Sequence, residues 1–327
     1  MIVVTGADGH IGNVLIRELL ASGEKNIRAL ILPGEDLTPL KGFDIEKIEG
    51  DITKPETLTR PFQGADLVFH LAGIIAISHG SEELMEKVNV QGTQNVIDAC
   101  FKSNVKRLVY TSTIHAIEEP PKGQVITEKL PFKPGQKKEG YDKSKARATI
   151  EVLEAVKKGL NAVIVCPSGV IGPYDFRISE MGQLFINVVH KKLFAYVQGA
   201  YDFVDVRDVA KGHILAAEKG KTGEVYILSG EQIYVGKIMQ ILKEITGVKP
   251  PRWRMPIWLA QLSADFAPIY YKITKTKPLF TRYSIHTLAS NSNISNQKAR
   301  QELGYSPRPI RESIKDAIQW LKDNNKL

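Results

Sequence analysis

The chain has 327 residues, of which 43% are hydrophobic and 24% charged, and it carries a formal net charge of +8. This length and apolar content predict a globular protein with a large core. The sequence opens without a basic leader or an apolar export segment, so we expect a cytoplasmic protein rather than a secreted one. The basic residues are dispersed and lack nucleic-acid-binding motifs, which argues against a nucleic-acid partner.

Short apolar runs rich in β-branched residues alternate with helical patterns through the first half of the chain. The runs predict strands at residues 2–5, 27–32, 66–71, 107–111 and 162–166, with helical stretches between them such as 11–20 and 84–100. This alternation is typical of βαβ units around a parallel sheet, and right-handed crossovers place the helices on both faces. The predicted fold class is therefore α/β, with a doubly wound parallel Rossmann sheet.

The pattern changes after residue 166, where Gly169, Gly172 and Pro173 interrupt the regular alternation. A strand at 223–228 and helices at 237–246, 257–271 and 313–322 are predicted beyond that point. Two domains are expected: a dinucleotide-binding domain of residues 1–166, to which 203–230 returns, and a smaller C-terminal substrate-binding domain of residues 167–202 and 231–327.

The run of residues 255–271 is apolar, although Gln261, Asp265 and two prolines interrupt it. It is shorter than the roughly 20 residues that a membrane span needs, so no transmembrane span is predicted. A buried or substrate-covering helix is the favoured interpretation, with contact to a membrane surface as the alternative.

A glycine-rich turn follows the first predicted strand and opens the first predicted helix, in the segment Thr5-Gly6-Ala7-Asp8-Gly9-His10-Ile11-Gly12. The first glycine permits the tight turn, the second lets backbone N–H groups approach a pyrophosphate, and the third allows helix and strand to pack closely. The helix N-terminus adds partial positive charge. We therefore predict a dinucleotide-binding site, whose candidate residues in this turn are Gly6, Asp8, Gly9, His10, Ile11 and Gly12.

The segment Tyr141-Asp142-Lys143-Ser144-Lys145 begins a predicted helix, and its tyrosine and second lysine stand one turn apart on one face. A phenol has an ordinary pKa of about 10, and a neighbouring ammonium lowers that pKa because it stabilises the phenolate. Tyr141 can then exchange a proton with an alcohol or carbonyl while a nicotinamide exchanges a hydride. Tyr141 and Lys145 are therefore predicted catalytic residues.

The order and spacing of these motifs resemble the extended branch of the short-chain dehydrogenase/reductase superfamily. Besides the glycine turn and the Tyr-x-x-x-Lys pair, residues 89–93, 167–173, 203–210 and 295–305 look like landmarks of members close to dihydroflavonol 4-reductase and 3β-hydroxysteroid dehydrogenase. The resemblance covers the whole chain. It implies further cofactor-binding residues, namely Asp51, Ile52, Leu71, Ala72, Gly73, Asn89, Thr111, Ser112, Pro167 and Ser168, besides Tyr141 and Lys145 themselves.

A third catalytic residue is expected at the end of the fifth strand, in Val109-Tyr110-Thr111-Ser112-Thr113, because open α/β sheets place ligands at the carboxyl ends of their strands. In the related enzymes the last hydroxyl of this run bonds the substrate oxygen. The resemblance therefore assigns the orienting role to Thr113, with Ser112 as the second choice and strand-end capping as the structural alternative.

Cofactor choice is predicted from the residues after the second strand. NAD enzymes favour an acid there, whereas NADP enzymes place an arginine near the 2′-phosphate. Leu32 stands where dihydroflavonol-reductase-like proteins often carry that arginine, and Glu35 and Asp36 follow. The predicted cofactor is NAD or NADP, with NAD favoured.

The predicted substrate is a small hydrophobic ketone or alcohol. Its pocket is expected to be formed, beside the helix at 256–271, by Gly182, Leu184, Phe185, Phe194, Tyr196 and Tyr201. The alternative for these residues is plain core packing between domains.

The favoured function is an NAD(P)-dependent oxidoreductase that interconverts a ketone and an alcohol, like a dihydroflavonol reductase or a hydroxysteroid dehydrogenase. One alternative is a sugar-nucleotide epimerase or dehydratase with tightly bound NAD, although Gly169-Val170-Ile171-Gly172-Pro173 departs from the Asn-Val-Tyr-Gly-Pro usual in those enzymes. Another is a non-catalytic dinucleotide sensor, against which the intact Tyr–Lys pair argues. By analogy with related enzymes, a homodimer is possible.

No metal site is predicted, because Cys100 and Cys166 belong to no Cys-x-x-Cys pair or Cys/His cluster and are expected to be core residues. His70, His79 and His115 have no catalytic or metal-binding residue type at a characteristic spacing in the sequence. We expect these three histidines to be structural or exposed.

Overall fold

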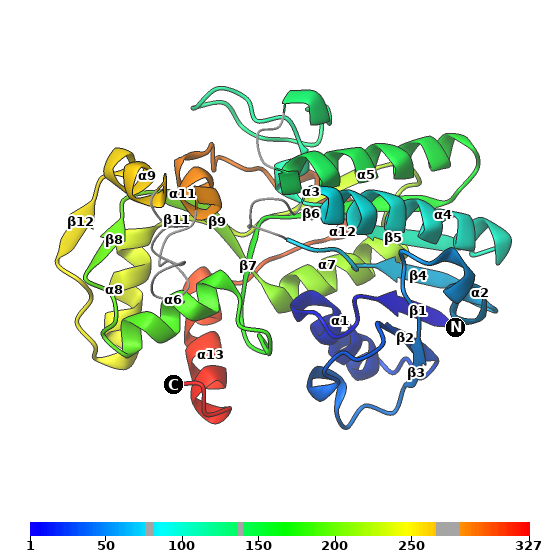
Figure 1. Cartoon of the computed structure of the whole chain (residues 1–327), viewed down its shortest axis with the longest axis horizontal. Coiled ribbons are helices and arrows are strands. Elements are labelled where there is room, and N and C mark those ends of the chain that lie inside the picture. Colours follow the sequence, from blue (N-terminus) through cyan, green and yellow to red (C-terminus); the bar gives the residue numbers. More distant parts are fainter. Residues whose placement is uncertain (76–81, 137–139, 266–281) are drawn as a thin grey trace.

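A computed structural model describes residues 1–75, 82–136, 140–265 and 282–327 (Figure 1). In this part of the chain a large parallel sheet with helices on both faces adjoins a smaller lobe. The large sheet has seven strands in the order β10-β6-β5-β4-β1-β2-β3. Its strands are β1 (Ile2–Thr5), β2 (Ile27–Ile31), β3 (Glu46–Glu49), β4 (Leu67–His70), β5 (Arg107–Thr111), β6 (Ala162–Pro167) and β10 (Val225–Leu228).

Helices cover both faces of this sheet because its central strands carry apolar side chains on both sides. They are α1 (His10–Ala21), α2 (Thr59–Phe62), α3 (Glu82–Met85), α4 (Gly92–Lys102), α5 (Gly140–Lys157), α7 (Val206–Lys219) and α12 (Gln297–Leu303). One core joins the strands to α4 and α5, and the other joins them to α1, α7 and α12, as Figure 1 shows. The predicted doubly wound Rossmann fold is confirmed.

Some predicted elements differ from the observed ones. The strand β3 was not predicted, because its sequence, Glu-Lys-Ile-Glu, is not an apolar run. It lies at the edge of the sheet and is mostly exposed. The helix predicted at 84–100 is three pieces, with the π-helical segment Glu86–Gln91 between α3 and α4. The helix predicted at 257–271 is observed as α9 (Ile257–Asp265), and residues 266–271 lie outside the described part.

The smaller lobe contains two short sheets and several helices. Its strands β7 (Gly169–Ile171), β9 (Ala200–Asp205) and β11 (Glu231–Tyr234) form one sheet, and β8 (Ala195–Val197) pairs with β12 (Trp253–Met255) in another. Its helices are α6 (Glu180–Val189), α8 (Val235–Thr246), α9, α11 (Arg282–Ala289) and α13 (Ile310–Asp323). No helix in the described ranges has the length and apolarity to cross a membrane.

The chain passes between the two parts more than once. After β9 it returns to the large sheet through α7 and β10, and β10 pairs in parallel with β6. Later, α12 packs against α7 and β10 before α13 packs against α8 and β9. The large sheet is therefore completed by segments that flank the smaller lobe in sequence.

Charged pairs at the start of α7 attach the C-terminal segment to this helix. Arg308 donates from Nε and Nη2 to the buried carboxylate of Asp208, at 3.1 and 2.8 Å to Oδ1, and its backbone N–H donates at 2.8 Å to Oδ2. Asp205 caps the helix by accepting from the Arg207 backbone N–H at 2.8 Å. Each carboxylate is thus matched by guanidinium and backbone donors.

Replacing Arg308 by Met should lower the free energy of unfolding by about 3 kcal/mol, because the Asp208 carboxylate would stay buried without its charged partner. The matched control is Arg311→Met, which breaks an exposed pair with Glu244 and should cost less than about 1 kcal/mol. Urea unfolding followed by circular dichroism measures both values. Equal costs for the two variants would contradict this account of the Asp208 contact.

Candidate active site

The glycine turn between β1 and α1 has the tight geometry that the sequence predicts. Gly6 adopts a positive φ of 66°, and the Gly9 N–H donates to the Gly6 carbonyl at 3.1 Å. A Cβ at Gly6 would lie 2.7 Å from the Ala72 nitrogen, and one at Gly12 would overlap the Gly6 carbonyl oxygen. The absence of side chains therefore lets strand, helix and the loop after β4 meet at the N-terminus of α1, where a pyrophosphate can bind.

Other predicted residues of the turn contact the segment between β7 and α6. His10 donates from Nε2 to the Pro173 carbonyl at 2.9 Å, and Asp8 forms an ion pair with Arg177. Ile11 is partly buried in the first turn of α1. Asn13, which sequence reasoning missed, donates to the Gly9 carbonyl at 2.8 Å and to the Tyr174 carbonyl at 3.3 Å.

The loop after β4 is held by Asn89. The Asn89 amide accepts from the Ile74 N–H at 2.9 Å and donates to the Ile74 carbonyl at 3.0 Å and to the Ser144 hydroxyl at 3.0 Å. Gly73 lies against Asn89, since a Cβ there would be 3.1 Å from its side-chain oxygen. The predicted residues Leu71, Ala72, Gly73 and Asn89 are thus brought together beside the glycine turn.

Asp51 and Ile52 lie beyond the carboxyl end of β3. The Asp51 carboxylate accepts from the Thr53 backbone N–H and hydroxyl, each at 2.8 Å, so it fixes its own turn. Ile52 is buried, and a Cβ at Gly92 would lie 2.7 Å from its Cδ1. Ile52 therefore packs this turn against the start of α4.

The three hydroxyl residues at the end of β5 have different partners. Thr111 bonds His213 at 2.7 Å, and Ser112 bonds Thr149 of α5 at 2.6 Å. Thr113 Oγ1 accepts from the His115 backbone N–H at 3.3 Å, and its side chain lies close enough to Tyr141 to lower the pKa of that phenol. The structure thus places Thr113 near Tyr141 and Ser112 against α5, and the orienting role of Thr113 stays a prediction.

Tyr141 and Lys145 stand one turn apart near the start of α5. The Lys145 ammonium is buried, donates to the Thr111 carbonyl at 2.6 Å and lies 4.5 Å from the centre of the Tyr110 ring. Tyr141 is partly exposed. The strand end and the helix therefore bring Thr113, Tyr141 and Lys145 to one place.

The expected lowering of the Tyr141 pKa by Lys145 is not seen in this structure. Partial desolvation raises the pKa of Tyr141 well above its ordinary value, with a further contribution from Asp142, while the Thr113 side chain acts in the opposite direction. Burial also lowers the pKa of Lys145 to about 7. Desolvation by the surrounding protein shifts both pKa values more than the expected attraction between the ammonium and the phenolate does.

Pro167 is the last residue of β6, and Ser168 follows it. The Ser168 hydroxyl donates to Asp202 Oδ1 at 2.5 Å, and the same oxygen accepts from the Gly230 N–H at 2.9 Å. Burial raises the pKa of Asp202 to about 6. This carboxylate, which sequence reasoning missed because it lies 34 residues away in the chain, fixes the Ser168 side chain.

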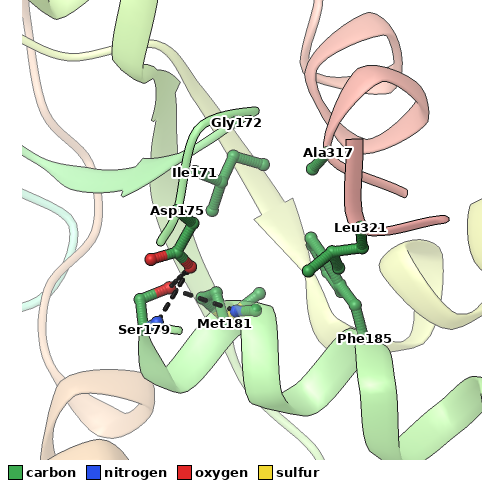
Figure 2. A pocket seen from close by; sticks show the side chains of 9 residues that line it. Ile171, Gly172, Asp175, Ser179, Met181, Phe185, Ala317 and Leu321 are labelled. Carbon is green, nitrogen blue, oxygen red and sulfur yellow. Dashed lines mark hydrogen bonds between the residues drawn. The ribbon is translucent and has the colours of Figure 1, made fainter. Parts of the chain in front are cut away.

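The residues of the predicted apolar pocket do not line one pocket in the described part of the chain. Four of them, Leu184, Phe185, Tyr196 and Tyr201, belong to or pack against one core cluster, which agrees with the alternative of core packing. Gly182 and Phe185 line a small pocket between α6 and α13, where Figure 2 shows Phe185 near Ala317 and Leu321. Phe194 is 62% exposed and lies beside Trp253, with ring centres 6.1 Å apart. The remaining predicted residues differ too: Leu184 packs against the core, Tyr196 is buried beside Gly236, and Tyr201 contacts His115.

Two of the three histidines singled out in the sequence have hydrogen-bonded partners. His70 is buried between the hydroxyls of Thr5 at 2.7 Å and Thr93 at 3.1 Å, and burial lowers its pKa to about 3. His115 bonds the Tyr201 hydroxyl at 2.7 Å and its backbone N–H donates to Thr113 Oγ1. His79 lies outside the described residues.

The fold and the placement of Thr113, Tyr141 and Lys145 define the class of this protein as an extended short-chain dehydrogenase/reductase, a class of NAD(P)-dependent enzymes. Residues 3–237 match the 3-beta hydroxysteroid dehydrogenase/isomerase family. The chain belongs to this family, which confirms the resemblance inferred from the motifs.

Similar proteins cover nearly the whole chain. Sterol demethylase protein B of Methylococcus capsulatus is 33% identical, with 99% of each chain aligned. The 3beta-hydroxysteroid-dehydrogenase/decarboxylase isoform 1 of Arabidopsis thaliana is 30% identical over 99% of this chain and 80% of its own length. The structure of the dTDP-glucose 4,6-dehydratase DesIV from Streptomyces venezuelae, with bound NAD, has a TM-score of 0.82 at 20% identity and covers 99% of this chain and 98% of its own, a likeness of fold.

The burial of Lys145 makes a prediction about stability and pH. Its pKa is about 7 in the folded protein, against an ordinary value of 10.5, so between these values the unfolded chain binds one more proton than the folded chain. The free energy of unfolding should therefore rise with pH in this window. From pH 7 to 9 the rise should exceed that of Lys145→Met by up to about 1.4 kcal/mol per pH unit.

Urea unfolding at several pH values measures this difference. The exposed neighbour Lys143→Met is the matched control and should keep the pH slope of the original protein. A Lys145→Met protein with an unchanged slope would show that Lys145 stays charged in the folded state.

Proposed function

We propose that the protein is an oxidoreductase that interconverts an alcohol and a ketone with NAD(P). The observation that carries this proposal is the grouping of Thr113, Tyr141 and Lys145 at the carboxyl end of β5, where Lys145 bonds the Thr111 carbonyl at 2.6 Å and stands one helical turn from Tyr141. The strands β1 and β5 both pair with β4 in parallel, so their carboxyl ends lie on the same side of the sheet. The glycine turn after β1 is therefore on the same side as Thr113. A nicotinamide and a substrate oxygen can share this side of the sheet.

In this proposal the chain's own residues orient the substrate and move one proton. The bound dinucleotide would supply the hydride acceptor or donor. Both the Thr113 and the Tyr141 hydroxyl bond the substrate oxygen in this proposal. Tyr141, held as a neutral phenol by its raised pKa, donates its proton to a ketone oxygen that gains a hydride on carbon. The reverse reaction starts from the Tyr141 phenolate, which takes the proton from the alcohol as the hydride leaves the carbon.

The proposed substrate is a hydrophobic alcohol or ketone of sterol-like size. The names of the relatives support this class, because a sterol demethylase protein and a hydroxysteroid dehydrogenase/decarboxylase align with almost the whole chain. NAD is the favoured cofactor. Leu32 is exposed at the position where an arginine would favour NADP. Glu35, which follows β2, pairs with Arg177, and Arg177 also pairs with Asp8 of the glycine turn.

The first experiment titrates the purified protein with NADH and NADPH and then adds ketones, flavanonols, steroids and UDP-sugars. Absorbance at the nicotinamide band should fall when a hydrophobic ketone is added. Conversion of a UDP-sugar without net loss of cofactor would instead support an epimerase or dehydratase. Dinucleotide binding without any turnover would support a sensor.

Replacing Tyr141 by Phe should lower kcat at least about 100-fold with the active ketone, because the proton donor is lost while the ring remains. Thr113→Ala should also lower kcat, although less, since Tyr141 is retained. The matched control is Tyr234→Phe, which removes a hydroxyl from an exposed tyrosine of β11 and should leave kcat unchanged. Steady-state kinetics decide, and full activity of Tyr141→Phe would exclude the proposed proton transfer.

A further inference from the structure

The segment between β7 and α6 lies across the dinucleotide turn, although the two are far apart in sequence. The His10 ring donates to the Pro173 carbonyl, and the Asn13 amide donates to the Tyr174 carbonyl. The Arg17 guanidinium lies 4.2 Å from the centre of the Tyr174 ring. Figure 1 shows this segment beside α1. The first helix of the Rossmann sheet therefore holds the segment through three successive contacts.

Local geometry fixes how the segment presents Arg177. Tyr174 and Ile178 adopt positive φ values of 65° and 49°, which few non-glycine residues do without support from their surroundings. Asp175 accepts from the Ser179 N–H at 2.8 Å and from its hydroxyl at 2.7 Å, and Ser179 in turn caps α6, as Figure 2 shows. Arg177 thus projects from a turn that is anchored on both sides.

Arg177 joins two carboxylates that come from different strand ends. Its Nη2 donates to Glu35 Oε2 at 2.7 Å, beyond the end of β2, and it also contacts Asp8 in the glycine turn. Asp8 is largely buried, whereas Arg177 remains about half exposed. Asp36 also interacts electrostatically with Arg177, but its carboxylate is hydrogen-bonded locally, accepting from the Thr38 N–H at 2.9 Å and from the Thr38 hydroxyl at 2.6 Å.

The position of this cluster relates it to the ribose of a dinucleotide. In Rossmann folds an acid shortly after the second strand bonds the ribose 2′-hydroxyl, whereas a nearby arginine accommodates a 2′-phosphate. Both kinds of residue occur here and neutralise each other in part: two carboxylates and one guanidinium leave a net charge of about −1. A 2′-hydroxyl can donate to such a cluster, but a 2′-phosphate must compete with Glu35 for Arg177.

We infer that Arg177 is a specificity-determining residue of the cofactor site, whose pairing with Glu35 and Asp8 sets the preference for NAD over NADP. The Arg177 guanidinium, which comes from the segment between β7 and α6, is the group that would bind a 2′-phosphate. Its ion pair with Glu35 competes with that binding. The inference rests on the proposed dinucleotide binding at the glycine turn. It assigns cofactor selection in part to the segment after β7, which lies outside the first βαβ unit.

The test measures the dissociation constants of NADH and NADPH by nicotinamide fluorescence for the full chain at one fixed salt concentration. Glu35→Gln should remove one of the two carboxylates that hold the guanidinium, and so lower the ratio of the NADPH to the NADH constant by about tenfold. Adding Arg177→Gln to that variant should abolish the gain. Arg177→Lys in the same background should keep part of it, because the charge remains without the planar fork.

The control is Lys192→Gln, which removes an exposed cation next to β8 and should leave the ratio unchanged. Two results would overturn the inference: a ratio that Glu35→Gln does not move, or a gain that persists in Glu35→Gln/Arg177→Gln. If the Arg177 substitutions raised the dissociation constants of NADH and NADPH by the same factor, Arg177 would have a structural role only. If the original protein binds neither dinucleotide, the proposed function itself fails, and that result differs from binding with an unaltered ratio.

Discussion

The close approach of backbone atoms at the first turn is the constraint on which the rest of the site depends. At Gly6 and Gly12 a side chain would collide with the loop after β4 and with the turn itself. The bare backbone therefore lets β1, α1 and that loop meet, and Asn89 connects the same loop to Ser144 of α5. The position of α5 relative to the glycine turn follows from these contacts.

Sequence alone predicted the features that depend on short spacing. The alternation of apolar runs gave the Rossmann sheet, and the Tyr141–Lys145 spacing placed both residues on one face of α5. Thr113 was separable from Ser112 because a known family assigns roles to the strand-end hydroxyls. In each case the informative residues lie within one strand, one turn or one helix.

The features that sequence did not predict depend on contacts between distant segments. Arg177 meets Asp8 across 169 residues, and Asp202 reaches Ser168 from another strand. No local pattern marks such pairs. The predicted pocket residues do not line one pocket for the same reason, since aromatic residues close in sequence, such as Phe194 and Tyr196, point to different surroundings once β8 forms.

Burial also explains why the electrostatics of the site differ from the expectation. Loss of water shifts the pKa of Lys145, Tyr141 and Asp202 toward values that favour their neutral forms. The motif suggested that an ammonium would act on a phenolate, which assumes that both charges persist. In a site of low polarity the charge that a ligand brings is felt more strongly than it would be in water.

The interleaving of the two parts of the chain limits how such a protein can diverge. Because β10 completes the large sheet only after the chain has passed through β7, α6, β8 and β9, the smaller lobe is not a contiguous insert. Recombination cannot exchange it between relatives as one cassette without also replacing α7 and the edge strand. The lobe, α7 and β10 therefore have to be inherited as one unit.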